Sequence, residues 1–228
     1  MSALVIIPTY LEAENIADVL GRVREAVPDA HVLVVDDGSP DGTADLAEAT
    51  AGQLGQIHVL RRSSKSGLGP SYRAGFAWGL ERGHTVLLEM DADLSHDPES
   101  LPAMVAALEA GADMVIGSRY VPGGATKNWP IHRRLLSRWG NRYTAGVLGL
   151  HLRDITSGFR GYRHGALAVI DAPSTEAEGY AFLTELALRA SDGGLRIEEV
   201  PILFADRTAG TSKMNYRIIS ESMLLVTG

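Results

Sequence analysis

Residues Thr85–Asp93 read Thr-Val-Leu-Leu-Glu-Met-Asp-Ala-Asp, an apolar run that ends in two carboxylates separated by one alanine. The apolar residues do not alternate with polar ones, as expected of a strand covered on both faces of a parallel sheet. Two carboxylates this close raise each other's pKa unless a positive group lies between them. A hard divalent cation with oxygen ligands satisfies that requirement and keeps positions open for phosphate oxygens. The stretch therefore predicts a buried strand with a candidate metal site at its exit, although Asp-x-Asp alone could also be a helix cap.

The same alternation of short apolar runs with longer amphipathic stretches continues along the chain, which is typical of strands joined by helices. The predicted strands are Leu4–Ile7, Val32–Val35, Ile57–Leu60, Thr85–Met90, Met114–Gly117, Phe159–Tyr162 and Ile197–Phe204. The predicted helices are Glu12–Val27, Asp41–Leu54, Pro70–Glu81 and Pro98–Ala110. This order predicts an α/β fold with a mostly parallel, twisted sheet flanked by helices and with right-handed crossovers.

The regular alternation of strands and helices ends after Gly117, where a Gly/Pro-rich loop at 121–124 leads to a basic segment, Ile131–Leu150. No repeat, low-complexity tract or long linker divides the chain. We therefore expect residues 1–228 to form a single domain whose second half elaborates the first.

Composition narrows the possible functions. The 228 residues carry a net charge of −7, which argues against nucleic-acid binding, and contain no cysteine, which excludes disulfides, thiolate metal sites and cysteine nucleophiles. No window approaches the ~20 consecutive apolar residues of a membrane span. The charge is uneven, since Arg119–Arg153 holds seven of the 21 Lys and Arg residues and no Asp or Glu. Such a block indicates an anionic ligand or surface, although any one cation could simply lie on a solvated helix face.

Polar residues follow three of the predicted strands. The first strand ends in Pro-Thr-Tyr-Leu-Glu at 8–12, the second in Asp-Asp-Gly-Ser at 36–39, and the fourth in Asp-Ala-Asp at 91–93. Ligands of open α/β sheets bind outside the carboxyl ends of the strands, so these three segments form the candidate site. Taken alone, the segment at 36–39 could also be a turn followed by a helix cap.

Two other chemistries use similar residues but fit poorly. Phosphatases of the haloacid dehalogenase type place Asp-x-Asp after their first strand, whereas this motif follows the fourth. Dinucleotide-binding enzymes need Gly-x-Gly-x-x-Gly after a strand, and Gly67-Leu-Gly-Pro70 lacks the third glycine. The seven histidines show no metal-ligand or Ser/His/Asp spacing.

The combined order of the motifs resembles family 2 glycosyltransferases of the GT-A fold. The resemblance rests on Val-Ile-Ile-Pro-Thr-Tyr, Val-Val-Asp-Asp-Gly-Ser-Pro-Asp-Gly-Thr, Lys65-Ser-Gly-Leu-Gly and Met-Asp-Ala-Asp-Leu-Ser-His. Within that family, Gly117-Ser-Arg-Tyr, Thr156-Ser-Gly-Phe-Arg and Arg207-Thr-Ala-Gly-Thr-Ser-Lys-Met are similar to the polyprenyl-phosphate (dolichyl-phosphate) mannose synthases. The resemblance extends from residue 4 to about residue 216.

The resemblance implies an inverting transfer of mannose from GDP-mannose to a polyprenyl monophosphate, dependent on Mg²⁺ or Mn²⁺. It also implies a nucleotide-binding part at about 1–118 and an acceptor-binding part at about 119–213. Two alternatives stay open: a polyprenyl-phosphate glucosyltransferase that uses UDP-glucose, and a non-catalytic subunit that anchors or regulates an active partner.

The resemblance also implies roles for individual residues on the donor side. The nucleotide pocket would contain Pro8, Tyr10 and Glu12, with Val35 and Asp37 at the base and ribose and with Asp91 and Ala92 along the nucleotide sugar. The metal would be bound by Asp93, with Asp91 and Ser95 beside it. Some relatives carry Gln at the Ser95 position, and a serine reaches less far, so a water would complete the metal's ligands.

The acceptor side of the resemblance is basic. Arg119, Arg207 and Lys213 correspond to positions around the diphosphate and the acceptor phosphate. Arg133 would join them, although Arg134 competes for the same alignment. A phosphate monoester has its second pKa near ~6 and is already ionised near neutral pH, so this acceptor needs cations rather than a general base.

A lipid acceptor implies a peripheral enzyme on the cytoplasmic face of a membrane, with a protein partner possible for anchoring. Residues at about 214–227 could form a membrane-interface helix whose face would contain Ile218, Ile219, Ser222, Met223 and Val226, although a core helix would show the same pattern. Arg134, Arg138 and Arg142 recur every four residues and would attract anionic headgroups.

Overall fold

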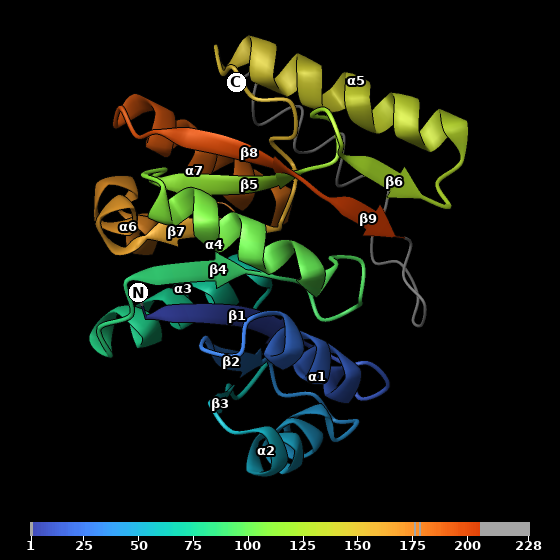
Figure 1. Cartoon of the computed structure of the whole chain (residues 1–228), viewed down its shortest axis with the longest axis vertical. Coiled ribbons are helices and arrows are strands. Elements are labelled where there is room, and N and C mark those ends of the chain that lie inside the picture. Colours follow the sequence, from blue (N-terminus) through green and yellow to red (C-terminus); the bar gives the residue numbers. More distant parts are fainter. Residues whose placement is uncertain (1, 176, 178, 206–228) are drawn as a thin grey trace.

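The apolar strands predicted from the sequence lie together in one seven-stranded sheet (Figure 1). The structure is a computed structural model that describes residues 2–175, 177 and 179–205. The strand order is β3-β2-β1-β4-β7-β5-β8. The bounds are β1 (Ala3–Thr9), β2 (His31–Asp36), β3 (Ile57–Arg61), β4 (Val86–Glu89), β5 (Met114–Ser118), β7 (Arg160–Arg163) and β8 (Ile197–Pro201). Only β7 runs antiparallel to its neighbours in this sheet, which confirms the mostly parallel α/β fold.

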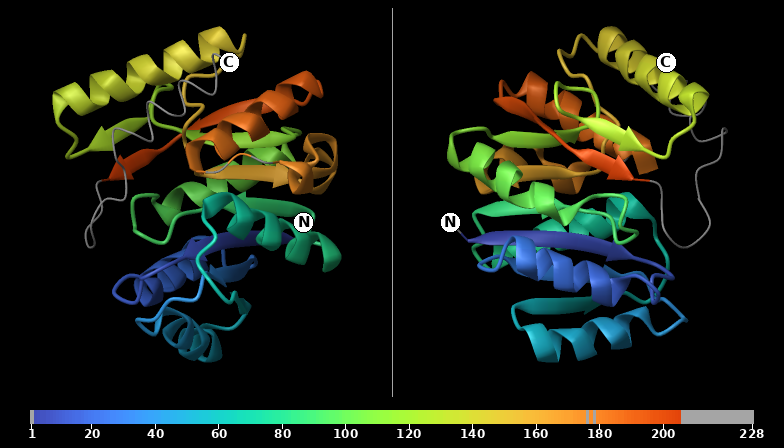
Figure 2. Two further views of the ribbon diagram at one scale, coloured as in Figure 1. Left: turned by 180° about the vertical axis from the view of Figure 1, so that it is seen from behind. Right: turned by 45° about the vertical axis from the view of Figure 1, so that its right-hand side comes forward.

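Helices cover both faces of the sheet (Figure 2). They are α1 (Ile16–Ala26), α2 (Thr43–Leu54), α3 (Leu68–Glu81), α4 (Leu101–Glu109), α5 (Ile131–Val147), α6 (His164–Ile170) and α7 (Gly179–Asp192), with short 3₁₀ turns at 98–100 and 172–174. No helix within the described ranges is both long enough and apolar enough to cross a membrane.

Each buried strand contributes to two cores because successive side chains point to opposite faces. In β1, Val5 and Ile7 pack with residues of α1, α2 and α4. Leu4 and Ile6 pack on the other face with residues of α3, α6 and α7. Helix α3 lies very close to the sheet, since a Cβ on Gly75 would lie 2.5 Å from the Cγ2 of Ile6. The glycine is therefore required by packing, and any larger residue there would push α3 away from β1.

The segment predicted as one strand at Ile197–Phe204 is in fact two strands, so this prediction is wrong in detail. β8 ends at Pro201, and β9 (Leu203–Ala205) pairs with β6 (Ala125–Lys127) in a separate two-stranded sheet. Ile202 lies between them, buried, and donates its N–H to the carbonyl of Ser118 (3.1 Å). Because β6 and β9 lie below α5 at one end of the main sheet, they connect that helix to the strand ends (Figure 1).

Other elements differ from the prediction at their ends or were not predicted. α1 begins at Ile16 rather than at Glu12, because residues 12–15 form a turn in which the Glu12 carbonyl accepts the N–H of Asn15 (3.0 Å). The basic segment predicted at Ile131–Leu150 is largely helix α5. β6, α6 and α7 were not predicted.

Candidate active site

The three polar segments predicted to form the site meet at one edge of the sheet. The chain winds outward from β1 to β2 and β3, and then returns to place β4 on the other side of β1. Strand order therefore reverses between β1 and β4, the position where open α/β sheets bind ligands. Thr9 pairs with Asp36 and Ile6 pairs with Glu89, so the loops after these three strands leave the sheet side by side.

The loops after β1 and β2 are fastened to each other by side-chain hydrogen bonds. Asp36 accepts the hydroxyl of Thr9 (2.9 Å) and both the amide (2.9 Å) and the hydroxyl (2.6 Å) of Ser39. The hydroxyl of Ser39 in turn accepts the N–H of Leu11 (3.1 Å). Asp36 is 2% exposed, so this carboxylate organises the loops rather than meeting a ligand.

Asp37, predicted at the base or ribose, is held by four protein donors. Its Oδ1 accepts Nη1 of Arg62 (2.8 Å) and the hydroxyl of Ser71 (2.9 Å), and its Oδ2 accepts the amides of Ser66 (3.0 Å) and Gly67 (3.3 Å). These bonds position the loop at 62–67, which brings Nζ of Lys65 to 4.3 Å from the ring centre of Tyr10. In this structure Asp37 therefore acts on the pocket through the loop that it holds.

Two further predicted donor-side residues are buried. Val35 is fully buried in the core below α3, and Ala92 is 3% exposed. Pro8 and Glu12 lie in or directly after β1, where both are half-buried. The amide nitrogen of Asn15 donates to the Glu12 carboxylate (3.0 Å). The side chain of Val35 thus offers no surface to a ligand here.

The loop after β4 that carries Asp91 and Asp93, here called the carboxylate loop, exposes its two acids to solvent to different extents. The Asp91 side chain is 34% exposed, whereas Asp93 is 4% exposed. Leu94 between Asp93 and Ser95 has φ of 59°, a left-handed conformation that is uncommon for a leucine. This sharp turn lets the N–H of Ser95 donate to Oδ1 of Asp93 (3.0 Å). The structure therefore brings the three predicted metal ligands together on one tight loop.

His96 supports this loop and was not predicted as a site residue. Its Nδ1 accepts the backbone N–H of Asp91 (3.1 Å) and lies 3.8 Å from Oδ2 of Asp91. The ring is 1% exposed, stacks on Phe159 (4.9 Å between centroids) and meets the ring of Phe204 edge-on (5.4 Å). The sequence feature that could have identified His96 as a site residue is its place in the Asp-Ala-Asp-Leu-Ser-His motif.

Glu89, two residues before Asp91, is fully buried. Burial raises the pKa of its carboxyl to about 8, against the opposing effects of Arg160 and of the Tyr162 hydroxyl, which donates to Oε2 (3.4 Å). The carboxyl is therefore mostly protonated at neutral pH. It adds little negative charge beneath the two exit carboxylates.

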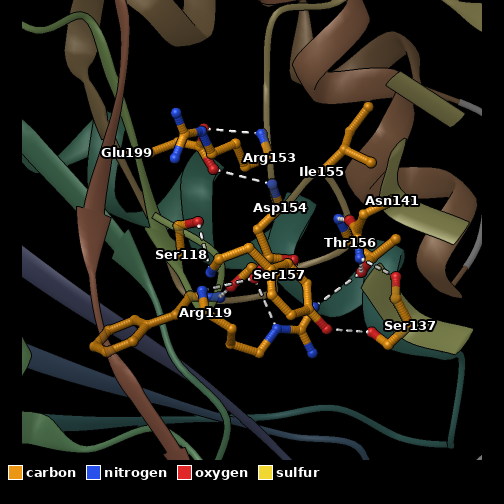
Figure 3. Close-up of polar contacts among 12 residues, drawn as sticks. Ser118, Arg119, Ser137, Asn141, Arg153, Asp154, Ile155, Thr156, Ser157 and Glu199 are labelled. Carbon is orange, nitrogen blue, oxygen red and sulfur yellow. Dashed lines mark hydrogen bonds and ion pairs between the residues drawn. The ribbon is translucent and has the colours of Figure 1, made fainter. Parts of the chain in front are cut away.

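Arg119, at the end of β5, is clamped by Asp154 (Figure 3). Its backbone N–H (2.8 Å), Nε (2.7 Å) and Nη2 (2.5 Å) all donate to the Asp154 carboxylate, and Nη2 also donates to the hydroxyl of Thr156 (3.0 Å). Asp154 is fully buried, and its own N–H donates to Glu199 (2.9 Å). Asp154 was not predicted, yet the sequence carries a signal: it is the first acid after the acid-free block that Arg119 begins.

Arg119 and Arg133 both lie near the ring of Trp129. The Arg119 guanidinium carbon lies 5.6 Å from the ring centre of Trp129, and that of Arg133 lies 4.0 Å from the same ring. Arg119 also lies 5.3 Å from the ring of Phe204. Two of the four predicted phosphate-binding cations are thus neighbours. The other two, Arg207 and Lys213, lie outside the described residues, as does the predicted interface helix at about 214–227.

The oxygen donors on the carboxylate loop make up only part of the coordination that a cation needs. No group of three or more His, Asp or Glu residues among those described has an arrangement that would hold a metal by itself. Asp91, Asp93 and Ser95 nevertheless supply two carboxylates and a hydroxyl, the oxygen ligands that Mg²⁺ and Mn²⁺ accept. These three residues therefore suit a cation that completes its coordination with water and phosphate oxygens.

Comparison with known proteins gives the family and the fold. The sequence model of the protein family "Glycosyl transferase family 2" matches residues 4–170 of this chain. The chain is 51% identical to a polyprenol monophosphomannose synthase of Mycolicibacterium smegmatis over 224 residues, covering 98% of this chain and 84% of that protein. It is 51% identical to an undecaprenyl-phosphate mannosyltransferase of Micrococcus luteus over 227 residues, covering 100% and 93%. A solved glucosyl-3-phosphoglycerate synthase from Mycobacterium tuberculosis, in complex with Mn²⁺, UDP and phosphoglyceric acid, matches with a TM-score of 0.69 and 19% identity, covering 100% of this chain and 78% of that one.

Proposed function

The chain belongs to glycosyl transferase family 2, and from that premise we propose that it transfers mannose from GDP-mannose to a polyprenyl monophosphate. The observation that carries the proposal is the 51% identity to two proteins named for mannose transfer to a polyprenyl phosphate, over nearly the whole chain. The reaction inverts the anomeric carbon and gives a β-linked lipid phosphosugar.

The donor lies at the point where strand order reverses. Tyr10, Glu12 and the loop that Asp37 holds would line the nucleotide, and Asp91, Asp93 and Ser95 would hold Mg²⁺ or Mn²⁺ beside its diphosphate. When bound, the cation stabilises the charge that develops on the departing diphosphate. The tight turn at Leu94 fixes the two carboxylates before the donor arrives, so little reorganisation is required.

The acceptor supplies its own nucleophile. A phosphate monoester is ionised near neutral pH, so no protein carboxylate or histidine is needed as a general base. The obstacle is the repulsion between the acceptor phosphate and the donor diphosphate. Arg119 and Arg133, with Arg207 and Lys213 from the sequence prediction, reduce it. Because Asp154 neutralises Arg119, this arginine contributes oriented N–H groups more than net charge.

Helix α5 supports a location at the membrane surface. It exposes a stripe of large apolar side chains, namely Ile131, Leu135, Leu136, Trp139, Tyr143 and Val147. Ile131 and Leu135 are 67% and 61% exposed, which is costly in water. Since Arg119–Arg153 contains no acid, the occupant that fits this stripe and its flanking arginines is a bilayer with anionic lipids. The chain would then lie peripherally on the cytoplasmic face, where the lipid acceptor is within reach.

A panel of sugar nucleotides tests the donor assignment by thermal shift in the presence of Mn²⁺ or Mg²⁺. GDP-mannose with metal should raise the melting temperature more than UDP-glucose does, and the metal should be required. A larger thermal shift with UDP-glucose than with GDP-mannose would indicate a glucosyltransferase instead. No shift with any sugar nucleotide would support a non-catalytic role.

A further inference from the structure

A second basic site lies away from the carboxylate loop. An open hollow of about 540 Å³ separates the N-terminal half of α5 from the loop that follows β5. Four of its lining residues are arginines from three separate stretches of the chain, Arg119, Arg134, Arg138 and Arg153, and none of the described residues that line it is an acid. Of the three arginines that recur every four residues on α5, the hollow includes Arg134 and Arg138 but not Arg142.

Three of the four charges in this hollow have no counter-charge among the residues that the structure describes. Asp154 neutralises Arg119, as described above. Arg134, Arg138 and Arg153 form no ion pair with any residue that the structure describes. Glu199 is near Arg153, but its two carboxylate oxygens accept the backbone amides of Arg153 and Asp154 (2.9 Å each). Three cations therefore converge with no partner among the described residues, which favours an anionic ligand.

The wall opposite α5 is rigid rather than a loose loop. The N–H of Gly124 donates to the carbonyl of Val121 (2.9 Å). A Cβ on Gly124 would lie 2.4 Å from the carbonyl oxygen of Ser118, so the turn can approach the end of β5 only because this residue is glycine. The hydroxyl of Tyr120 donates to Ser137 on α5 (2.7 Å) and joins the two walls. The hollow is thus a formed cleft.

We propose that this cleft binds the phosphate group of a membrane lipid. Guanidinium groups form forked hydrogen bonds to phosphate oxygens and are the cations best suited to this recognition. The remaining lining includes Val121, Pro122 and Leu135, which suit a hydrocarbon chain rather than a soluble anion. Leu135 also belongs to the exposed apolar stripe of α5, so the cleft opens beside the surface assigned to the bilayer.

The cleft is distinct from the donor site but adjoins it through Arg119. Arg119 lines the cleft, and its guanidinium lies 5.3 Å from the ring of Phe204. Phe204 packs against His96, which holds the backbone of Asp91. A lipid phosphate bound here would be close to the transfer site without occupying it. The occupant that we propose is therefore a bulk anionic phospholipid, because the phosphate of the polyprenyl acceptor must reach the transfer site itself.

The choice of a lipid rests on the proposed function, whereas the preference for phosphate rests only on the arginines. The test therefore uses the full chain and two kinds of probe, inorganic phosphate and vesicles. Vesicles of phosphatidylcholine would contain either phosphatidylglycerol or a polyprenyl monophosphate. The variants are Arg134→Gln, Arg138→Gln and Arg153→Gln, each made singly. The matched control is Arg142→Gln, which removes the same charge from the same helix outside the cleft.

We expect phosphate affinity to fall at least about tenfold in the cleft variants, the loss of one charge-assisted hydrogen bond, and about twofold or less in Arg142→Gln. Binding to vesicles that contain phosphatidylglycerol should fall in the same order, whereas a larger loss with polyprenyl monophosphate would show that the cleft belongs to the acceptor site instead. Equal losses in the cleft variants and in Arg142→Gln would overturn the proposal, as would a loss with inorganic phosphate alone. The thermal shift with GDP-mannose and Mn²⁺ should be unchanged in every variant; its absence in the wild type would instead contradict the proposed function.

Discussion

Arg119 and Asp154 form a bidentate ion pair that is almost completely removed from water. The guanidinium donates Nε and Nη2 to the two carboxylate oxygens at 2.7 and 2.5 Å, and the two residues are 9% and 0% exposed. The pair joins the end of β5 to the loop before β7, across 35 residues of sequence that contain no other acid. It therefore fixes both a predicted phosphate-binding residue and the base of the segment that carries α5.

Asp154→Asn should destabilise the fold because it leaves a buried guanidinium without its counter-charge. The expected loss is about 3–5 kcal/mol in the free energy of unfolding, measured by urea denaturation. The matched control is Asp45→Asn, which breaks an exposed ion pair with Arg61 and should cost at most about 1 kcal/mol. Similar losses in the two variants would contradict a special role for the buried pair.

Asp93→Ala should remove the metal dependence of donor binding and leave the fold intact, because the residue lies on a loop beyond the strand. Loss of a direct metal ligand should weaken metal-dependent binding of GDP-mannose at least about 100-fold in calorimetry. Asp97→Ala is the control on the same loop, since Asp97 pairs with Arg22 (2.9 Å) and caps the 3₁₀ turn at 98–100. Unchanged binding by Asp93→Ala in the presence of Mn²⁺ would show that the metal site is elsewhere.

Strands whose apolar runs lack alternation were predictable from the sequence, because burial on both faces leaves a local signature. β1, β2 and β4 lie where the runs at residues 4, 32 and 85 begin, and the Asp-Ala-Asp motif lies at the predicted exit. The short strands β6 and β9 left no such signature. Each has three residues, and their pairing depends on where α5 and Pro201 bring the chain rather than on local composition.

Some features of the candidate site were likewise predictable from the sequence and others were not. The sequence placed Asp91, Asp93 and Ser95 together because they are neighbours along the chain. It could not show that Asp37 is held by Arg62 or that Asp154 clamps Arg119. Each of these facts depends on contacts between segments distant in sequence, which no local pattern encodes.

Trp139→Ala should weaken binding to anionic vesicles. Trp139 is 56% exposed and its ring stacks with that of Tyr143 (5.5 Å between centroids), so it can enter the bilayer without rearrangement. Burial of such a side chain contributes about 1.5–3 kcal/mol, which corresponds to roughly 10- to 100-fold in partitioning. Flotation is the measurement, and Val169→Ala, an exposed apolar residue of α6, is the control. Equal binding by the Trp139 and Val169 variants would exclude α5 as the membrane surface.

A histidine cluster at the opposite edge of the sheet should make stability depend on pH. His31 Nδ1 lies 3.3 Å from His58 Nε2, and His84 Nδ1 lies 2.9 Å from the Ser2 hydroxyl. Trp78 packs on the rings of His58 and His84, and Arg82 lies over Trp78. Burial, together with the charges of His31 and Arg82, lowers the pKa of His58 and of His84 below the ordinary 6.5.

At these two histidines the folded chain binds fewer protons than the unfolded chain just below pH 6.5, so their contribution to stability falls as the pH falls. Glu89, whose pKa is raised to about 8, contributes in the opposite direction, so variants are needed to isolate the histidines. Denaturation midpoints at roughly pH 5.5 and 7.5 measure this. His58→Gln and His84→Gln should each raise the midpoint at the lower pH relative to that at the higher pH, which is a reduction of the histidine contribution. The exposed His132 offers the control His132→Gln, and a reduction of the same size there would contradict the role of the cluster.

The most direct test of the account is the lipid product itself. The full chain would be incubated with Mn²⁺, a polyprenyl monophosphate and an equal mixture of GDP-mannose labelled with ¹³C in its mannose and unlabelled UDP-glucose. The lipid fraction would be analysed by mass spectrometry, where the label distinguishes two hexosyl lipids that are otherwise isomers. The account predicts a mannosyl phosphoryl lipid, formed only with metal and lost in Asp93→Ala. A glucosyl lipid as the main product, or no glycosylated lipid while both donors bind, would contradict it.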